Sequence, residues 1–148
     1  MTNKTKVALE TNDVLNLSMR ALDGFTYIWT SASNSISYSS DLSEWASVSK
    51  DVQKRLSASD EPDAFQKLLH PDDLEKFQKN WVSAMKGDSQ KLDLEYRFIA
   101  DKGDYRWQRN VGTVTRDHKG HAVSISGIAY DIHSVKKREA ESSLKEQR

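Results

Sequence analysis

The sequence contains no cysteine, and this one absence excludes several kinds of site. Without a thiol the chain forms no disulfide, no zinc–thiolate centre, no cysteine nucleophile and no c-type haem attachment. The sequence also lacks the patterns G-x-G-x-x-G, G-x-x-x-x-G-K-[ST] and H-E-x-x-H, and it has no EF-hand loop. The usual glycine-rich phosphate loops, the zinc-protease helix and the calcium loop are therefore excluded.

Neither sign of charge is in excess, since 22 lysines and arginines balance 22 aspartates and glutamates. A neutral chain gives no electrostatic footprint for nucleic acid or for an anionic membrane. No stretch approaches the roughly 18 consecutive apolar residues of a membrane helix, and residues 1–10 lack the apolar run of a secretory signal. We therefore expect a soluble, cytoplasmic chain that binds no nucleic acid and makes no contact with a membrane.

The length of 148 residues suits one globular domain with flanking segments. Leu15, Met19 and Leu22 recur at helical spacing, and Gly24 is placed to end that helix. The last residues are highly charged, with opposite charges four apart, which predicts a solvated helix. The predicted division is a polar tail (1–10), an N-terminal flanking helix (11–24), a central domain (25–132) and a C-terminal helix (133–148).

Within the central domain, the period of the apolar residues predicts an α+β fold. The expected elements are a hairpin (25–30 and 35–38), a short helix that Asp41 caps (42–48), a mobile connection (49–62), a long helix (71–86) and three long strands (92–100, 105–115 and 122–132). Pro71 starts the long helix, Asp72 and Asp73 satisfy its N-terminus, and Gly87 ends it. Three strands joined by short turns form an antiparallel meander, with the helices on one face of the sheet.

No acid–base pair or metal cluster stands out among the polar residues. His118 and His121 flank one turn, but two imidazoles on a loop make a poor metal site. Glu95, Arg97 and Arg109 are expected to form a surface network without catalytic meaning. Several aromatic residues are candidates for the wall of a small-molecule cavity, although such residues are more often plain core: Tyr27, Trp29, Trp45, Trp81, Tyr96, Phe98, Tyr105 and Trp107.

Five short motifs follow one another through the second half of the chain: Leu69-His-Pro-Asp-Asp-Leu74, Glu95-Tyr-Arg97, Asp101-Lys-Gly-Asp-Tyr-Arg-Trp107, Asp117-His-Lys-Gly120 and Gly127-Ile-Ala-Tyr-Asp-Ile132. Together they resemble a PAS domain with its PAC motif, over about residues 22–134. The resemblance implies a five-stranded antiparallel sheet in the order 2-1-5-4-3 with helices on one face. It also implies a sensory or dimerisation module of a bacterial-type signalling protein, in which the C-terminal helix leads to an effector domain such as a histidine kinase or diguanylate cyclase.

The resemblance assigns roles to particular residues. It implies a ligand cavity at Tyr96, Phe98, Gln108 and Asn110, and signal coupling at Trp107, Asp131 and His133. The family most often has Asp-Ile-Thr at the domain exit, where the threonine hydroxyl commonly caps the exit helix. Here His133 replaces that threonine. We therefore expect Asp131 to hold the helix instead, paired with a basic residue near the helix start. Trp107 is expected to face outward, covered by the helix of residues 12–22 or by a second subunit.

Two cofactors of related sensors are not expected here. Photosensory LOV relatives, which bind flavin, carry amides at the positions of Phe98, Gln108 and Ala129, and only Gln108 keeps an amide. The reactive cysteine of those relatives has no counterpart either. Haem-binding sensors of the family sometimes place an axial ligand at the position of His70, which we interpret instead as the residue before a helix-starting proline.

We therefore expect a regulatory module and not an enzyme, with any catalysis in a missing effector domain. Sensing of a small molecule and homodimerisation are equally weighted roles, and in both the C-terminal helix transmits the signal. The alternative is a small isomerase-type enzyme on a curved α+β sheet, which needs a carboxylate and a tyrosine or second acid in one apolar pocket. The order of the predicted elements argues against that alternative.

Overall fold

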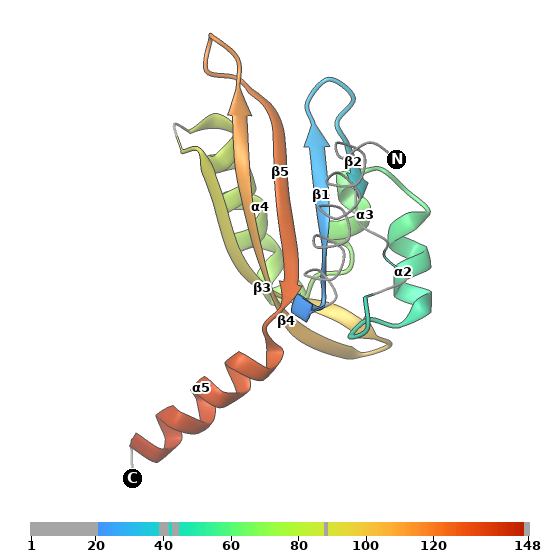
Figure 1. Ribbon diagram of the computed structural model, residues 1–148, viewed down its shortest axis with the longest axis vertical. Helices are drawn as coiled ribbons and strands as arrows, with labels where there is room; N and C mark the ends of the chain where they lie inside the picture. Colours follow the sequence, from blue (N-terminus) through green and yellow to red (C-terminus); the bar gives the residue numbers. More distant parts are fainter. Residues whose placement is uncertain (1–20, 39–41, 43–44, 88, 147–148) are drawn as a thin grey trace, which may run out of the picture.

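The structure of the chain is a computed structural model, which describes residues 21–38, 42, 45–87 and 89–146. The elements are β1 (Gly24–Thr30), β2 (Ser35–Tyr38), α2 (Lys50–Ser57), α3 (Pro62–Gln66), α4 (Pro71–Lys86), β3 (Lys91–Asp101), β4 (Asp104–Arg116), β5 (Ala122–Asp131) and α5 (His133–Glu146) (Figure 1). The long helix and the three long strands lie within one residue of their predicted ends.

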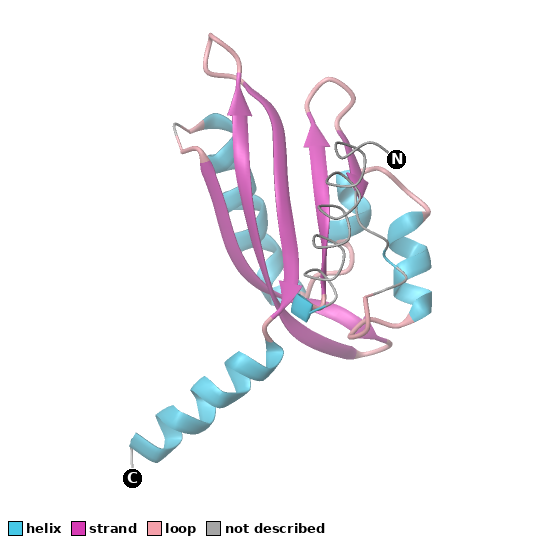
Figure 2. Cartoon of the chain, viewed as in Figure 1, coloured by secondary structure: helices cyan, strands magenta, loops and turns pink. Residues whose placement is uncertain are grey.

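The five strands form one antiparallel sheet in the order β2-β1-β5-β4-β3. Strands β3, β4 and β5 make the predicted meander, and β1 closes on β5 with Tyr27 opposite Gly127. Helices α3 and α4 lie against one face of this sheet, whereas α5 leaves the end of β5 and projects away from the domain (Figure 2). The predicted α+β class and strand order are confirmed.

The core lies between the inner face of the sheet and the helices, and aromatic rings dominate it. Phe65 of α3 is at its centre, with ring centroids 5.3 to 6.4 Å from four other rings, those of Phe25, Phe77, Tyr96 and Phe98. Burying one phenylalanine side chain stabilises a fold by about 1.5–3 kcal/mol. This ring cluster is therefore a large part of what holds α3 and α4 to the sheet.

The start of α4 is tied to β3 by a carboxylate that was predicted to serve the helix itself. The His70 side chain is the N-cap, and its Nδ1 accepts the Asp72 backbone N–H at 3.1 Å. Asp73 reaches across to Arg97, accepting from the backbone N–H at 2.7 Å and from the guanidinium at 2.8 and 3.0 Å. The Arg97 hydrogen bonds lower the pKa of Asp73 below its usual value.

The predicted N-terminal segments fall mostly on residues 1–20, which lie outside the described residues. Residues 21 and 22 are helical and Asp23 forms a turn, so the described part of the flanking helix ends just before Gly24, as predicted, and Gly24 is the first residue of β1. The left-handed position is Asp23, with a φ of 54°. A Cβ on Gly24 would lie 2.1 Å from the carbonyl oxygen of Ala129, so the close approach of β5 requires glycine there.

Residues 49–62 are more ordered than their composition indicated. They are predicted as a mobile connection with one helical turn, whereas residues 50–57 form the two-turn helix α2 and Pro62 is the first residue of α3. In α2, Val52 and Leu56 lie one turn apart and are buried, and Ser49 Oγ accepts the Val52 N–H at 3.3 Å as the N-cap. The helix predicted for 42–48 is wrong over residues 45–48, which form turns, although Trp45 and Val48 are buried; Asp41 lies outside the described residues.

Candidate functional site

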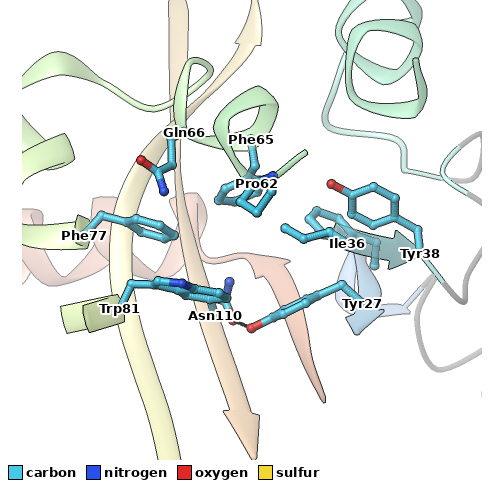
Figure 3. A pocket seen from close by; sticks show the side chains of 10 residues that line it. Tyr27, Ile36, Tyr38, Pro62, Phe65, Gln66, Phe77, Trp81 and Asn110 are labelled. Atoms are coloured by element: carbon cyan, nitrogen blue, oxygen red, sulfur yellow. Dashed lines mark hydrogen bonds between the residues drawn. The ribbon is translucent and has the colours of Figure 1, made fainter. Parts of the chain in front are cut away.

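A small pocket lies between the sheet and helices α3 and α4 (Figure 3). It is lined by Phe25, Tyr27, Ile36, Tyr38, Pro62, Phe65, Gln66, Phe77, Trp81 and Asn110. The space not filled by atoms is about 360 Å³ and opens in part to solvent; about 20 Å³ of it admits the centre of a water molecule, which is enough for ordered water. The described residues that line it include no aspartate, glutamate, lysine, arginine or histidine.

A chain of hydrogen bonds runs from the pocket wall into the core. The Tyr27 hydroxyl donates to Asn110 Oδ1 at 2.6 Å, and Asn110 Nδ2 donates to the Tyr96 hydroxyl at 3.4 Å. The Tyr96 hydroxyl donates in turn to Gln108 Oε1 at 2.6 Å. A buried polar group that loses its partner costs about 1–3 kcal/mol, so this chain holds each of its members in one orientation.

Burial keeps the tyrosines of this region neutral. Desolvation raises the pKa of Tyr27, Tyr38 and Tyr96 well above the usual value of about 10. At Tyr27 and Tyr96 the hydrogen bond with Asn110 opposes this effect without overcoming it. All three hydroxyls therefore keep their protons at physiological pH.

Of the four residues predicted for the cavity, Asn110 lines the pocket. Tyr96 and Gln108 lie behind it in the hydrogen-bonded chain, and Phe98 packs against other core rings. Tyr27 and Trp81, two of the aromatic candidates, are also in the wall. The sequence interpretation missed the whole contribution of α3, because a five-residue helix shows no apolar period that could reveal it.

The three residues predicted to couple the domain to its C-terminal helix meet at the start of α5. The Trp107 backbone N–H donates to His133 Nδ1 at 3.2 Å, and the Trp107 carbonyl accepts the Ile132 backbone N–H at 2.9 Å. Asp131 Oδ1 accepts the His133 backbone N–H at 3.0 Å, as a helix cap does. The basic partner of Asp131 is Arg106 of β4, at 2.7 Å, and not a residue near the helix start, because β4 runs beside β5.

The Trp107 indole lies under two cations on the outer side of the sheet. The Arg97 guanidinium is 5.3 Å and the Lys136 ammonium 5.1 Å from the ring centroid. Lys136 of α5 also pairs with Glu95 of β3 at 2.5 Å, which raises the pKa of Lys136. The first turn of α5 is thereby held against β3 and β4. The N-terminal helix predicted to cover Trp107 lies outside the described residues.

Three separate ion pairs replace the network predicted for Glu95, Arg97 and Arg109. They are Arg97–Asp73, Arg109–Asp93 and Lys136–Glu95. Asp73 belongs to α4 and Lys136 to α5. The pattern of residues within a strand does not predict which helix packs beside it, so these two partners could not be foreseen.

The described residues do not fit a haem bound through His70. This residue is not in the pocket wall, and its ring packs on Tyr105 at 4.8 Å. Its Nδ1 accepts a hydrogen bond, so in the neutral ring the proton sits on Nε2, which is then a donor and not a metal ligand. Of the three positions where flavin-binding relatives carry amides, Gln108 alone has one here, and its Oε1 already accepts a hydrogen bond from the Tyr96 hydroxyl. In the described part of the chain, no three histidine, aspartate or glutamate side chains gather as a metal site.

Comparison with known proteins decides the family. A family model described as "PAS fold" matches residues 54–129, which is just over half of the chain. The chain belongs to the PAS family. This match includes α4, β3 and β4 and most of β5, so the PAS domain contains the pocket wall at Asn110 and the strand that carries Trp107. The isomerase alternative is left without support.

Several known proteins resemble the chain in sequence or in fold. Over 71 residues it is 32% identical to the uncharacterized protein y4lL of Sinorhizobium fredii, a match that covers 48% of this chain and 8% of that protein. The crystal structure of a sensory box histidine kinase/response regulator from Burkholderia thailandensis superposes with a TM-score of 0.63 at 18% identity, covering 90% of this chain and 95% of that one. The N-terminal domain of a diguanylate cyclase with PAS/PAC sensor from Marinobacter aquaeolei superposes with a TM-score of 0.57 at 17% identity. This match covers 76% of this chain and 98% of that one. At these identities the structural likeness is one of fold.

Among the described residues, no helix combines the length and the apolar character that crossing a bilayer demands.

Proposed function

We propose that this PAS module senses a small molecule in the pocket and reports it to an effector domain through α5. The observation that carries the proposal is the double role of β4. Asn110 of this strand is part of the pocket wall, and Trp107, three residues earlier, holds the first residues of α5. One strand thus contacts both the candidate binding site and the candidate output.

The hydrogen-bonded chain supplies a route between the two ends. A ligand that competes for the Asn110 amide disturbs Tyr96, and Tyr96 holds Gln108. Gln108 lies opposite Asp131 in the sheet register, and Asp131 caps the start of α5. The ligand would act by favouring one of two arrangements of this helix root, which requires a different affinity for each arrangement.

The position of α5 suggests where an effector domain would be attached. This helix extends away from the domain (Figure 1), and we place an effector after it, such as a histidine kinase or diguanylate cyclase, which carries any catalysis. In support, the match to y4lL covers 8% of a much longer protein, and two proteins of similar fold are named as parts of those two enzyme classes. A homodimer and a cytoplasmic location complete the proposal.

Hydrogen exchange in α5 tests the route. Replacing Asn110→Leu removes both of its hydrogen bonds and leaves a side chain of similar size. We expect faster exchange of the amides of residues 134–140, measured by mass spectrometry, relative to amides of β3 in the same sample. The matched control is Val111→Ala, on the next position of β4 and the opposite face. A folded Asn110→Leu variant with unchanged exchange in α5 contradicts the route.

Native mass spectrometry of the freshly purified chain tests the homodimer.

A further inference from the structure

We infer that the pocket selects small, uncharged ring compounds that carry a hydrogen-bond acceptor, and that Asn110 is the residue that recognises the acceptor. This inference rests on the proposed sensing function and specifies the chemical class of the ligand. It follows from the charge of the pocket wall, from the unused hydrogen-bonding capacity of one amide, and from the space available.

The absence of ionised groups in the described wall excludes charged ligands. Six of its ten side chains are aromatic, and the nearest polar groups are amides and hydroxyls. Burial raises the pKa of Tyr27 and Tyr38, so neither becomes a charged partner at physiological pH. A carboxylate or ammonium that entered would lose its water without gaining a counter-ion, and such burial is strongly unfavourable. A flat, uncharged ring, in contrast, can make edge and face contacts with the aromatic side chains of the wall.

The amide of Asn110 offers a donor that the protein leaves largely unused. The side chain is 3% exposed, and its Oδ1 is fixed by the Tyr27 hydroxyl. An amide nitrogen has two N–H donors. Among the described residues, Nδ2 makes one hydrogen bond, the long one of 3.4 Å to Tyr96. Figure 3 shows this nitrogen directed into the space between Trp81 and Pro62. A buried donor in that position is satisfied by a ligand carbonyl, ether or ring nitrogen.

The size of the ligand is limited by the α3 wall. The space that admits a water centre, about 20 Å³, is smaller than a ring needs. A ring therefore enters when Pro62 and Gln66 move outward. The helix that carries them has five residues, its N-cap Glu61 makes no side-chain capping bond, and an exposed Gln78–Gln66 hydrogen bond of 3.0 Å joins it to α4. One ring with a short substituent is the size that such a limited movement accommodates.

Three compounds of nearly the same shape test the inference on the unchanged 148-residue chain. Acetophenone is neutral and has one acceptor, ethylbenzene is neutral and has none, and benzoate is an anion. Dissociation constants come from titrations followed by ¹H–¹⁵N NMR, with shifts at residues 62–66 and 108–110 identifying the pocket. We expect acetophenone to bind about three- to tenfold more tightly than ethylbenzene, the value of one net hydrogen bond. Benzoate should bind at least tenfold more weakly than acetophenone.

The variant Asn110→Leu assigns the recognition to one residue. It should bring acetophenone and ethylbenzene to equal affinity, while the shifts stay in the pocket. The spectrum of the variant reports whether it folds, and if it does not, Asn110→Ser serves in its place, with a weakened preference expected because its hydroxyl is shorter than the amide.

Each contrary outcome has a distinct meaning. Benzoate binding as tightly as acetophenone overturns the uncharged class, and equal binding of ethylbenzene by the unchanged chain overturns the role of Asn110. If none of the three shifts the pocket resonances, the ligand class is wrong. If acetophenone binds in the pocket but leaves residues 133–146 unshifted, the ligand class stands and the proposed transmission through α5 fails.

Discussion

Asp73 shows how one side chain takes a role that its position in the sequence does not reveal. Two carboxylates in the first turn of a helix are commonly explained by the helix dipole. Here His70 caps the helix, and Asp73 instead binds both the backbone and the side chain of Arg97 on β3. The local pattern predicted the helix start correctly, but the partner of Asp73 depends on where the chain places β3.

Replacing Asp73→Asn should lower the free energy of unfolding by about 1–3 kcal/mol at pH 7, because it removes charge-assisted hydrogen bonds from a side chain that is 16% exposed. The folded state lowers the pKa of Asp73, so its contribution is present above the usual value of about 4 and is lost as the pH falls through the folded value. Urea unfolding at neutral and acidic pH measures this.

The control for that experiment is Asp93→Asn. Its carboxylate also pairs with an arginine, Arg109, at 2.7 Å, but the side chain is 52% exposed. Solvent screening limits such a pair to under about 1 kcal/mol. Equal losses for the two variants, or an Asp73→Asn effect that does not shrink in acid, would show that the contact with β3 is not what stabilises the fold.

Arg116 acts between two elements, fastening the end of α4 to β4. Its guanidinium donates to carbonyls of the last turn of α4, those of Ala84 and Met85, and to those of Ser89 and Gly120. The last carbonyls of a helix have no partner within the helix, so this arginine supplies what the helix end lacks. Nothing in the spacing of the sequence marks residue 116 for that role.

Replacing Arg116→Met should destabilise the chain by about 1.5–3 kcal/mol, the range for hydrogen bonds that involve a charged group. Arg116→Lys should recover a part of this, because an ammonium restores the charge near the helix end but not the forked geometry. Thermal unfolding of the unchanged chain and of the two variants at one pH measures their order of stability. A lysine variant as weak as the methionine variant would show that charge near the helix end contributes nothing.

Helix α2 marks where element prediction failed. Its exposed residues are lysine, aspartate, arginine and serine, and this composition resembles a loop. The signal that was present is short: Ser49 before the helix and the apolar pair Val52 and Leu56. Two apolar residues become a helix face when a core is there to receive them, and the neighbouring β3 provides that core.

For the whole molecule, the buried tyrosines make the free energy of unfolding fall at alkaline pH. Burial raises the pKa of Tyr27, Tyr38 and Tyr96 above the unfolded value of about 10. Their contribution to stability is therefore complete below pH 10 and is lost as the pH rises from there through the folded values. We expect tyrosinate absorbance of three of the five tyrosines to appear together with unfolding.

A spectrophotometric titration followed alongside circular dichroism measures this expectation. The variant Tyr38→Phe should remove about one third of the delayed absorbance, since desolvation, the main cause of the raised pKa, remains at Tyr27 and Tyr96. Ionisation of all five tyrosines while the chain is still folded would mean that the pocket region is open to solvent.

The elements that could be predicted from the amino-acid sequence are those whose signal is local. Apolar–polar alternation predicted β3, the turns at residues 101–103 and 117–120 delimited β4 and β5, and Pro71 with a continuous apolar stripe predicted α4, since neighbouring residues carry each of these signals. The ordered motifs were enough for the PAS family. Tertiary structure alone decided the pairing of Lys136 with Glu95, the capping role of Arg116 and the α3 wall of the pocket. Each of these joins segments distant in the chain, and their meeting depends on how the helices pack on the sheet.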